Sequence, residues 1–156
     1  MFECDIPGFG PVRLEHLVSD FTGTLSVDGK LLPGVKEHLR SISETLNVHI
    51  LTADTFGMAR SELAGLSCEM HILSGQSHDA QKEQYVRRLG CGKVVALGNG
   101  NNDRLMLAAA RIGIAVCLRE GCSTDAVKAA DIVVMSATDA LELLLHRKRL
   151  TATLRF

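Results

Sequence analysis

The chain has 156 residues and a formal net charge of -1, from 17 Lys and Arg against 18 Asp and Glu. Hydrophobic residues make up 46% and charged residues 22%, which is typical of one globular domain and argues against a disordered chain. The balanced charge argues against a general nucleic-acid binder and against a polybasic membrane-surface protein.

Three features bear on the compartment. No apolar run approaches the roughly 20 residues of a membrane helix, since the run Ile112–Leu118 is followed by Arg119. Glu3 and Asp5 do not fit the start of a secretion signal. The five cysteines are odd in number and form no CxxC pair, which predicts reduced thiols. We therefore expect a cytoplasmic protein that does not contact a membrane.

Extended segments alternate with segments of helical period along the chain. Residues 1–16 contain Pro7–Pro11 between two extended pieces, which predicts a hairpin on the edge of the sheet. A smaller hairpin is predicted in 25–33, where Asp28-Gly29 lies between apolar pairs. Short apolar runs rich in β-branched residues predict buried parallel strands at 17–19, 48–52, 70–73, 93–97, 112–118 and 132–135.

The segments between these runs are long enough for crossover helices. These helices are predicted at 34–46, 55–66, 78–89, 103–111 and 123–130, with a last helix over 138–150. The alternation predicts an α/β fold, a single Rossmann-like three-layer domain with a parallel sheet between two helical layers. We expect one domain over 1–156, with its core at 17–136 and a C-terminal helix and tail at 137–156. The cations His146–Arg149 suit a helix C-terminus.

Polar residues follow several of the predicted strands. Ligands of open parallel sheets bind beyond the carboxyl ends of the strands. Asp20 follows the first strand, Thr52 ends the second, and Gly-Asn-Gly-Asn-Asn-Asp at 98–103 follows the fourth, while Lys82 lies on the helix after the third. Acidic and other oxygen ligands suit Mg²⁺, whereas a lysine and a hydroxyl suit phosphate oxygens. The sequence therefore predicts a metal and phosphate site at this edge.

The spacing of the residues argues against three other kinds of site. No GxxxxGK[ST] occurs, so the chain has no P-loop. The segment 98–103 begins like GxGxxG but carries Asp103 at the third glycine position, which argues against a dinucleotide site. The six histidines form no HExxH, which argues against a zinc site.

Four segments resemble the motifs of a known superfamily. Asp20–Leu25, Asp-Phe-Thr-Gly-Thr-Leu, resembles motif I of the haloacid-dehalogenase-like hydrolases in its P-type ATPase form. Thr52 and Lys82 match motifs II and III, and Gly98–Asp103 resembles the GDGxND of motif IV. Residues 105–116 are similar to the segment that follows motif IV in P-type ATPases. The match over 17–136 implies a stand-alone, soluble, P-type-ATPase-like member.

The resemblance implies a role for each matching residue. Asp20, Thr22 and Lys82 are the implied catalytic residues, and Asp20 is the nucleophile that forms an aspartyl-phosphate. The implied phosphate-binding residues are Thr52, Ala53, Lys82 and Gly23, and the implied Mg²⁺ ligands are Asp20, Thr22, Asp103 and Asn99. The residues alone also fit a plainer interpretation of Lys82 as a solvated helix lysine, because Gln81 and Glu83 flank it.

Two positions depart from the superfamily pattern. Most phosphatases of the superfamily have an aspartate at the position of Thr22 that acts as general acid and base, a role worth roughly 10²–10⁴-fold that a threonine does not fill at neutral pH. Asn99 replaces the first aspartate of motif IV and removes one negative charge from the metal site. We therefore expect slow turnover and weak Mg²⁺ binding.

The spacing of the motifs leaves no room for a cap domain. The predicted hairpin, helices and strand fill the segments from Asp20 to Thr52 and from Thr52 to Lys82. An open site suits bulky substrates, unless a second copy of the chain covers it in a homo-oligomer. We expect a Mg²⁺-dependent phosphohydrolase for a small phosphorylated molecule or a phosphoprotein. Weak ATP hydrolysis and a low-turnover regulatory protein that binds phosphate or metal are the alternatives.

Overall fold

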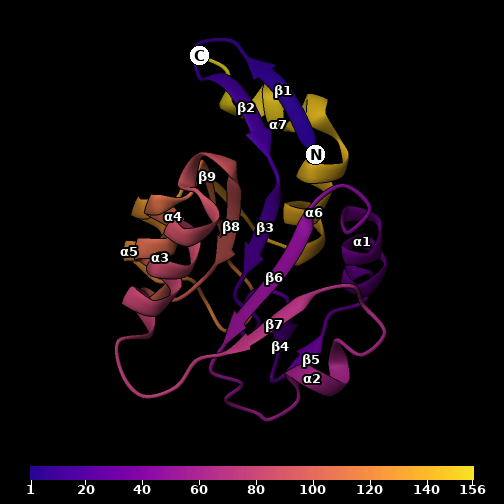
Figure 1. Ribbon diagram of the computed structural model, residues 1–156, viewed down its shortest axis with the longest axis vertical. Coiled ribbons are helices and arrows are strands. Elements are labelled where there is room, and N and C mark those ends of the chain that lie inside the picture. The colour runs from indigo at the N-terminus through magenta and orange to yellow at the C-terminus, as the bar shows by residue number, and fades with distance from the viewer.

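The computed structural model describes residues 1–156, whose centre is a six-stranded parallel sheet (Figure 1). The sheet has the order β10-β9-β8-β3-β6-β7. Its strands are β3 (His16–Ser19), β6 (Asn47–Thr52), β7 (Glu69–Ile72), β8 (Val94–Gly98), β9 (Ile112–Val116) and β10 (Ile132–Val134). The chain leaves β3 toward β6 and β7, then crosses to β8 and continues outward to β10. The winding thus reverses between β3 and β8, where ligands of such sheets bind.

Helices cover both faces of this sheet, and the predicted three-layer α/β fold is confirmed. Helices α1 (Val35–Ile42) and α6 (Ala137–Leu145) pack in a cluster of 28 buried residues on one face. The other face carries a cluster of 8 buried residues with α3 (His78–Leu89), α4 (Arg104–Ala109) and α5 (Thr124–Ala129). Two 3₁₀ turns, η1 (Cys91–Lys93) and η2 (Asn101–Asp103), flank β8. None of the helices has the length and apolarity that crossing a bilayer requires.

Three helix predictions were partly wrong. In the segment 55–66 only α2 (Ala59–Glu62) is helical, because Gly57 and Gly65 adopt positive φ angles of 67° and 79° on either side of it. Helix α1 ends four residues before the predicted boundary. The predicted helix 138–150 is two helices, α6 and α7 (Arg147–Leu154), separated by His146 with φ -120° and ψ 81°. The cations therefore begin α7 instead of ending a helix.

Two hairpins lie outside the main sheet. Strands β1 (Phe2–Ile6) and β2 (Gly10–Leu14) form an antiparallel pair of their own, so the prediction that this hairpin extends the sheet edge was wrong. The pair packs against α7 at the N-terminal end of β3 (Figure 1). Strands β4 (Ser26–Val27) and β5 (Lys30–Leu31) form the small hairpin that the sequence predicts. Asp28 and Gly29 have φ angles of 52° and 80°, as a type I′ turn requires.

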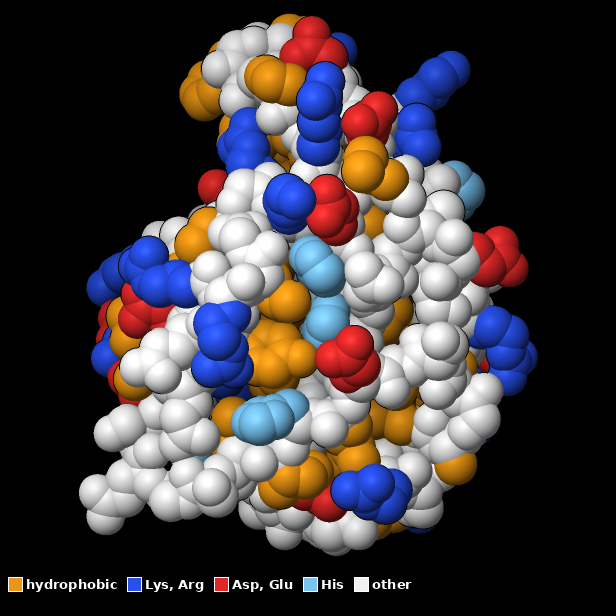
Figure 2. Space-filling view, in the orientation of Figure 1, with side chains coloured by type: hydrophobic (Ala, Val, Ile, Leu, Met, Phe, Trp, Pro, Cys, Tyr) orange, Lys and Arg blue, Asp and Glu red, His pale blue; other side chains and the backbone are white.

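Part of the sheet is not covered by a helix on the face that Figure 2 shows, where histidine side chains gather near the centre. His16 Nδ1 lies 3.0 Å from His49 Nε2, and His49 Nδ1 lies 3.0 Å from the Tyr85 hydroxyl. Lysine, arginine and carboxylate side chains are interspersed on this face (Figure 2).

Candidate active site

A buried lysine joins two carboxylates at the point where the winding of the sheet reverses. Asp20 directly follows β3, and its N–H donates to the Leu97 carbonyl of β8 at 3.0 Å. Lys82 reaches this edge from α3, with Nζ 2.8 Å from Asp20 Oδ1 and 2.6 Å from Asp103 Oδ1. Lys82 and Asp103 are completely buried, and Asp20 is 7% exposed. The structure thus brings three of the predicted site residues into direct contact, and Lys82 is not a solvated lysine.

The charges in this cluster do not cancel. Two carboxylates face one ammonium group, which leaves one negative charge uncompensated in a buried place. Burial and the neighbouring charge of Asp103 raise the pKa of Asp20 to about 6, against the opposing effect of Lys82. Burial acts to lower the pKa of Lys82, but the charges of Asp20 and Asp103 outweigh it and raise that pKa. Lys82 therefore remains charged at neutral pH.

Asp103 uses both of its carboxylate oxygens within the protein. Oδ1 accepts from Lys82, and Oδ2 accepts the N–H groups of Asn99 and Gly100, both at 2.9 Å. A Cβ atom on Gly98 would lie 2.5 Å from the Asp103 Cβ, so only glycine fits there. Asp103 thereby orients Lys82 and the loop after β8. Its assignment as a direct Mg²⁺ ligand stays a prediction, and Oδ1, which accepts a single hydrogen bond, keeps one lone pair for it.

Thr24 links the nucleophile candidate to the loop after β8. Its hydroxyl lies 3.3 Å from Asp20 Oδ2 and 3.2 Å from Asn99 Oδ1. The Asn99 amide is oriented by its Nδ2, which donates to the Gly121 carbonyl at 3.0 Å. One hydroxyl hydrogen serves only one of these two acceptors, so an oxygen is left without a donor. The sequence interpretation missed Thr24, although it lies in the segment that resembles motif I.

These oxygens fit a hard divalent cation. The Oδ2 of Asp20 and the Oδ1 of Asn99 share a single donor, and the cluster carries an uncompensated negative charge. Oxygen ligands and a net negative charge are what Mg²⁺ requires. Thr22, another of the implied Mg²⁺ ligands, lines the same cavity as Asp20 and Asn99.

A cavity of about 230 Å³ opens above Asp20, and Thr22, Thr52 and Ala53 line it together with the loop after β8. The Thr52 hydroxyl accepts the N–H of Asp54 at 2.9 Å, so its own hydrogen is free to donate to a ligand oxygen. The predicted phosphate contact of Gly23 stays a prediction. Its N–H donates to the Ser26 carbonyl at 2.9 Å within the turn that closes motif I, so a phosphate contact of this group competes with that bond.

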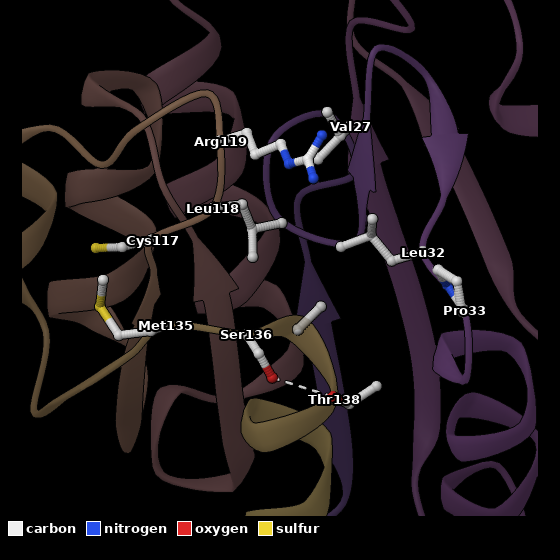
Figure 3. Close-up of a pocket in the computed structure, with 10 residues that line it drawn as sticks. Val27, Leu32, Pro33, Cys117, Leu118, Arg119, Met135, Ser136 and Thr138 are labelled. Atoms are coloured by element: carbon white, nitrogen blue, oxygen red, sulfur yellow. Dashed lines mark hydrogen bonds between the residues drawn. The ribbon is translucent and has the colours of Figure 1, made fainter.

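An apolar cavity of about 440 Å³ lies under the small hairpin (Figure 3). Val27 and Leu32 of the hairpin region face Leu118 of the loop after β9 across this cavity (Figure 3). The Ser136 and Thr138 hydroxyls lie 3.0 Å apart at its floor. This cavity has no lining residue in common with the cavity above Asp20.

Comparison with known proteins gives no matching family model, but it gives relatives. The uncharacterized protein MJ0073 of Methanocaldococcus jannaschii is 49% identical over 63 residues, which are 40% of this chain and 68% of that protein. The probable copper-transporting ATPase HMA5 of Arabidopsis thaliana is 36% identical over 129 residues. That match spans 80% of this chain but 12% of the ATPase.

The fold is shared with solved structures of two kinds. The cobalt-bound deoxy-D-mannose-octulosonate 8-phosphate phosphatase YrbI of Haemophilus influenzae matches with a TM-score of 0.69 and 14% identity, over 85% of this chain and 88% of that one. The catalytic domain of the CPx-ATPase CopB-B matches with a TM-score of 0.59 and 25% identity, over 75% of this chain and 46% of that one. Since the residues of motifs I to IV also converge on one edge of this fold, the chain belongs to the haloacid-dehalogenase-like superfamily.

Proposed function

We propose that this chain is a Mg²⁺-dependent phosphohydrolase that forms an aspartyl-phosphate on Asp20. The observation that carries the proposal is the buried Asp20–Lys82–Asp103 cluster at the base of an open cavity. The substrate is a small phosphorylated molecule or a phosphoprotein. The shared fold with phosphatases supports the reaction class, and the solved Moraxella catarrhalis phosphatase of this fold contains magnesium and phosphate ions.

In the first step, a carboxylate oxygen of Asp20 attacks the phosphorus of a phosphate monoester. A bond forms between this oxygen and phosphorus, and the bond from phosphorus to the leaving oxygen breaks. The leaving oxygen takes its proton from water, because the chain carries Thr22 where a general acid would stand. Lys82 offsets the negative charge of Asp20, and the Thr52 hydroxyl donates to a phosphoryl oxygen.

In the second step, water attacks the phosphorus of the aspartyl-phosphate. The bond between phosphorus and Asp20 breaks, inorganic phosphate leaves, and the proton of the water passes to solvent. Thr22 is not a base at neutral pH, so this step lacks general base catalysis, which contributes roughly 10²–10⁴-fold elsewhere. Hydrolysis of the phosphoenzyme is therefore the slow step.

Mg²⁺ would be held by side-chain oxygens of Asp20, Asn99 and Asp103 and by the Thr22 carbonyl. When bound, it would supply positive charge beside the transferred phosphoryl group. We expect Asn99→Asp to tighten Mg²⁺ binding at least severalfold, because a carboxylate replaces a neutral amide. Calorimetric titration of the purified protein with MgCl₂ measures this, and equal or weaker binding by the variant would show that Asn99 does not contact the metal.

ATP hydrolysis is the second candidate. It is favoured by the P-type form of motif I and by the 36% identity to a plant copper-transporting ATPase. The chain spans 12% of that relative, so the proposal concerns the phosphorylation reaction alone.

The test compares hydrolysis of acetyl phosphate, p-nitrophenyl phosphate and ATP, with MgCl₂ and with EDTA. We expect turnover of the first two in MgCl₂ and none in EDTA, with loss of turnover and of acyl-phosphate labelling in Asp20→Asn. Asp125→Asn, an exposed aspartate on α5, is the matched control. Turnover retained by folded Asp20→Asn would sink the covalent mechanism.

A further inference from the structure

A glutamate outside the four motifs lies in a loop that is fixed against Asn99. Glu120 belongs to the loop after β9, which turns at Gly121, where φ is 81° and the N–H donates to the Leu118 carbonyl at 3.0 Å. The same loop binds the backbone of Asn99, because the Ser123 N–H donates to the Asn99 carbonyl at 2.7 Å. Glu120 is therefore carried by the segment that holds the altered position of motif IV.

The Glu120 carboxylate and the Asn99 amide lie against the same side of Gly23. A Cβ atom on Gly23 would lie 2.6 Å from Asn99 Nδ2 and 2.8 Å from Glu120 Oε2. Both distances are too short for a real Cβ atom, so these two groups fill the space that a side chain at position 23 would need. The carboxylate is thus a neighbour of the nitrogen of the amide.

The small hairpin keeps Glu120 in this place. Glu120 Oε1 accepts the N–H of Asp28, at the tip of the β4–β5 hairpin, at 3.0 Å. The ion pairs of the chain do not include Glu120, and the neighbouring Arg119 extends toward Val27 (Figure 3). Glu120 is exposed to solvent, so its charge acts on the site at reduced strength.

The two ends of the Asn99 amide have different surroundings. Nδ2 donates to the Gly121 carbonyl at 3.0 Å and has the Glu120 carboxylate beside it. Oδ1 lies 3.2 Å from the Thr24 hydroxyl, which also contacts Asp20 Oδ2. Turning the amide by half a rotation would place Oδ1 against a carbonyl and a carboxylate, both of which repel it. The charges around Asn99 therefore favour the orientation with Oδ1 toward Asp20.

From these contacts we propose that Glu120 is a positioning residue of the metal site. Its carboxylate holds the Asn99 amide with Oδ1 toward Asp20, and it adds negative charge beside the position where motif IV usually has an aspartate. Groups that orient a metal ligand change metal affinity about 10–100-fold when they are removed. This inference rests on the proposed function, which assigns Asn99 to Mg²⁺.

The same contacts account for the amide at position 99. An aspartate there would direct one carboxylate oxygen at the Gly121 carbonyl and at Glu120. Like charges close together disfavour each other, so this chain carries the negative charge at position 120 and a neutral ligand at position 99.

The first test is calorimetric titration of the purified protein with MgCl₂. We expect Glu120→Gln, which keeps an oxygen acceptor for the Asp28 N–H, to weaken Mg²⁺ binding about threefold, as for one screened charge. Glu120→Ala removes the acceptor as well and should weaken binding about tenfold or more. Glu37→Gln, the same change at an exposed glutamate of α1, is the matched control and should bind Mg²⁺ like the wild type.

The second test is a double-mutant cycle between positions 99 and 120. The two oxygens of an aspartate are equivalent, so in the Asn99→Asp background Glu120→Ala should weaken Mg²⁺ binding less than it does in the wild type. Urea unfolding in EDTA adds a measurement without metal. Asn99→Asp should lower the midpoint more when residue 120 is glutamate than in Glu120→Gln, because the two carboxylates repel each other.

These measurements separate the role of Glu120 from the metal site itself. Mg²⁺ binding by Glu120→Ala equal to that of the wild type, or additive effects of the two positions in either cycle, would overturn the role of Glu120 while wild-type binding upholds the site. Absence of Mg²⁺ binding by the wild type would overturn the proposed metal site, and the role of Glu120 with it.

Discussion

Lys82 sets the electrostatics of the site because it is the one cation between two buried carboxylates. Its Nζ contacts Asp20 and Asp103 at the same time, so the two carboxylates share one positive charge. The remaining negative charge is buried, which is electrostatically unfavourable, and burial together with the charge of Asp103 raises the pKa of Asp20. This uncompensated charge lowers the stability of the fold, as is common at functional sites, and it fits the proposed Mg²⁺.

We expect Asp20→Asn to stabilise the metal-free protein at pH 7.5. The pKa of Asp20 is raised by folding from 3.8 to about 6, so its ionised form disfavours the folded state. Below about pH 4, protonated Asp20 makes its full contribution to the free energy of unfolding. This contribution, on the order of 2–3 kcal/mol, is lost as the pH rises through 6. Asparagine carries no charge at any pH, so the advantage of the variant should grow across this window.

Urea unfolding in EDTA at pH 4.5, 6 and 7.5 measures the difference between variant and wild type. The exposed Asp125→Asn serves as the control for a general effect of net charge. A variant less stable than wild type at pH 7.5 would contradict the sign assigned to the Asp20 environment.

Thr22 is the residue whose replacement should accelerate the reaction. Hydrolysis of an aspartyl-phosphate needs a base for water, and a carboxylate at this cavity-lining position supplies one. We expect Thr22→Asp to raise steady-state turnover about tenfold or more and to lower the amount of phosphoenzyme. Rapid-quench labelling with acetyl phosphate separates formation from hydrolysis. If hydrolysis is not faster in the variant, repulsion between the added charge and phosphate dominates.

The residues of the site differ in how far the sequence predicts them. Asp20, Lys82, Thr52 and Asp103 follow strands or lie on a helix in an order that places them at one edge of a parallel sheet. Thr24 was missed because its role depends on a side-chain rotamer that brings one hydroxyl between two acceptors. The contact between Asn99 and the Gly121 carbonyl depends on loop conformations, which no periodic pattern encodes.

Elements with a strong burial pattern were the most predictable ones. Strands β6, β8 and β9 consist mainly of buried residues, and their apolar runs end close to the structural boundaries.

The break between α6 and α7 was missed because it contains neither glycine nor proline. Leu141 and Leu144 mark the apolar face of α6, and beyond the turn at His146 helix α7 packs on β1, a tertiary contact that gives no local sequence signal.

Helix α6 begins with a capping side chain whose removal is testable. Ser136 Oγ accepts the N–H of Asp139 at 3.0 Å, which satisfies one of the free donors in the first turn. We expect Ser136→Ala to lower the free energy of unfolding by about 1 kcal/mol, the usual cost of losing such a cap. Ser41→Ala, at an exposed position inside α1, should change it by less than about 0.5 kcal/mol. Urea unfolding followed by circular dichroism gives both values, and equal effects would mean that the cap contributes nothing.

The C-terminal end of the chain packs on the β1–β2 hairpin, at the end of the molecule opposite the active site (Figure 1). The N–H of Phe156 donates to the Pro7 carbonyl at 3.0 Å, and α7 packs against β1 (Figure 1). Phe2, Ile6 and Leu14 of the β1–β2 hairpin belong to the same buried cluster as the sheet and α6. The hairpin and the sheet thus share one hydrophobic core, and a change in the hairpin is transmitted to the whole fold.

Ile6→Ala tests this coupling. Ile6 is completely buried, and its truncation removes apolar contacts and leaves a cavity, which typically costs about 2–5 kcal/mol. If hairpin and sheet unfold together, urea unfolding should remain a single transition with an unchanged slope and a midpoint lowered accordingly. Glu3→Ala, at an exposed position of the same strand, should leave the midpoint nearly unchanged. Two separate transitions in Ile6→Ala, with the sheet melting at the wild-type midpoint, would show instead that the hairpin is an appendage that folds independently of the core.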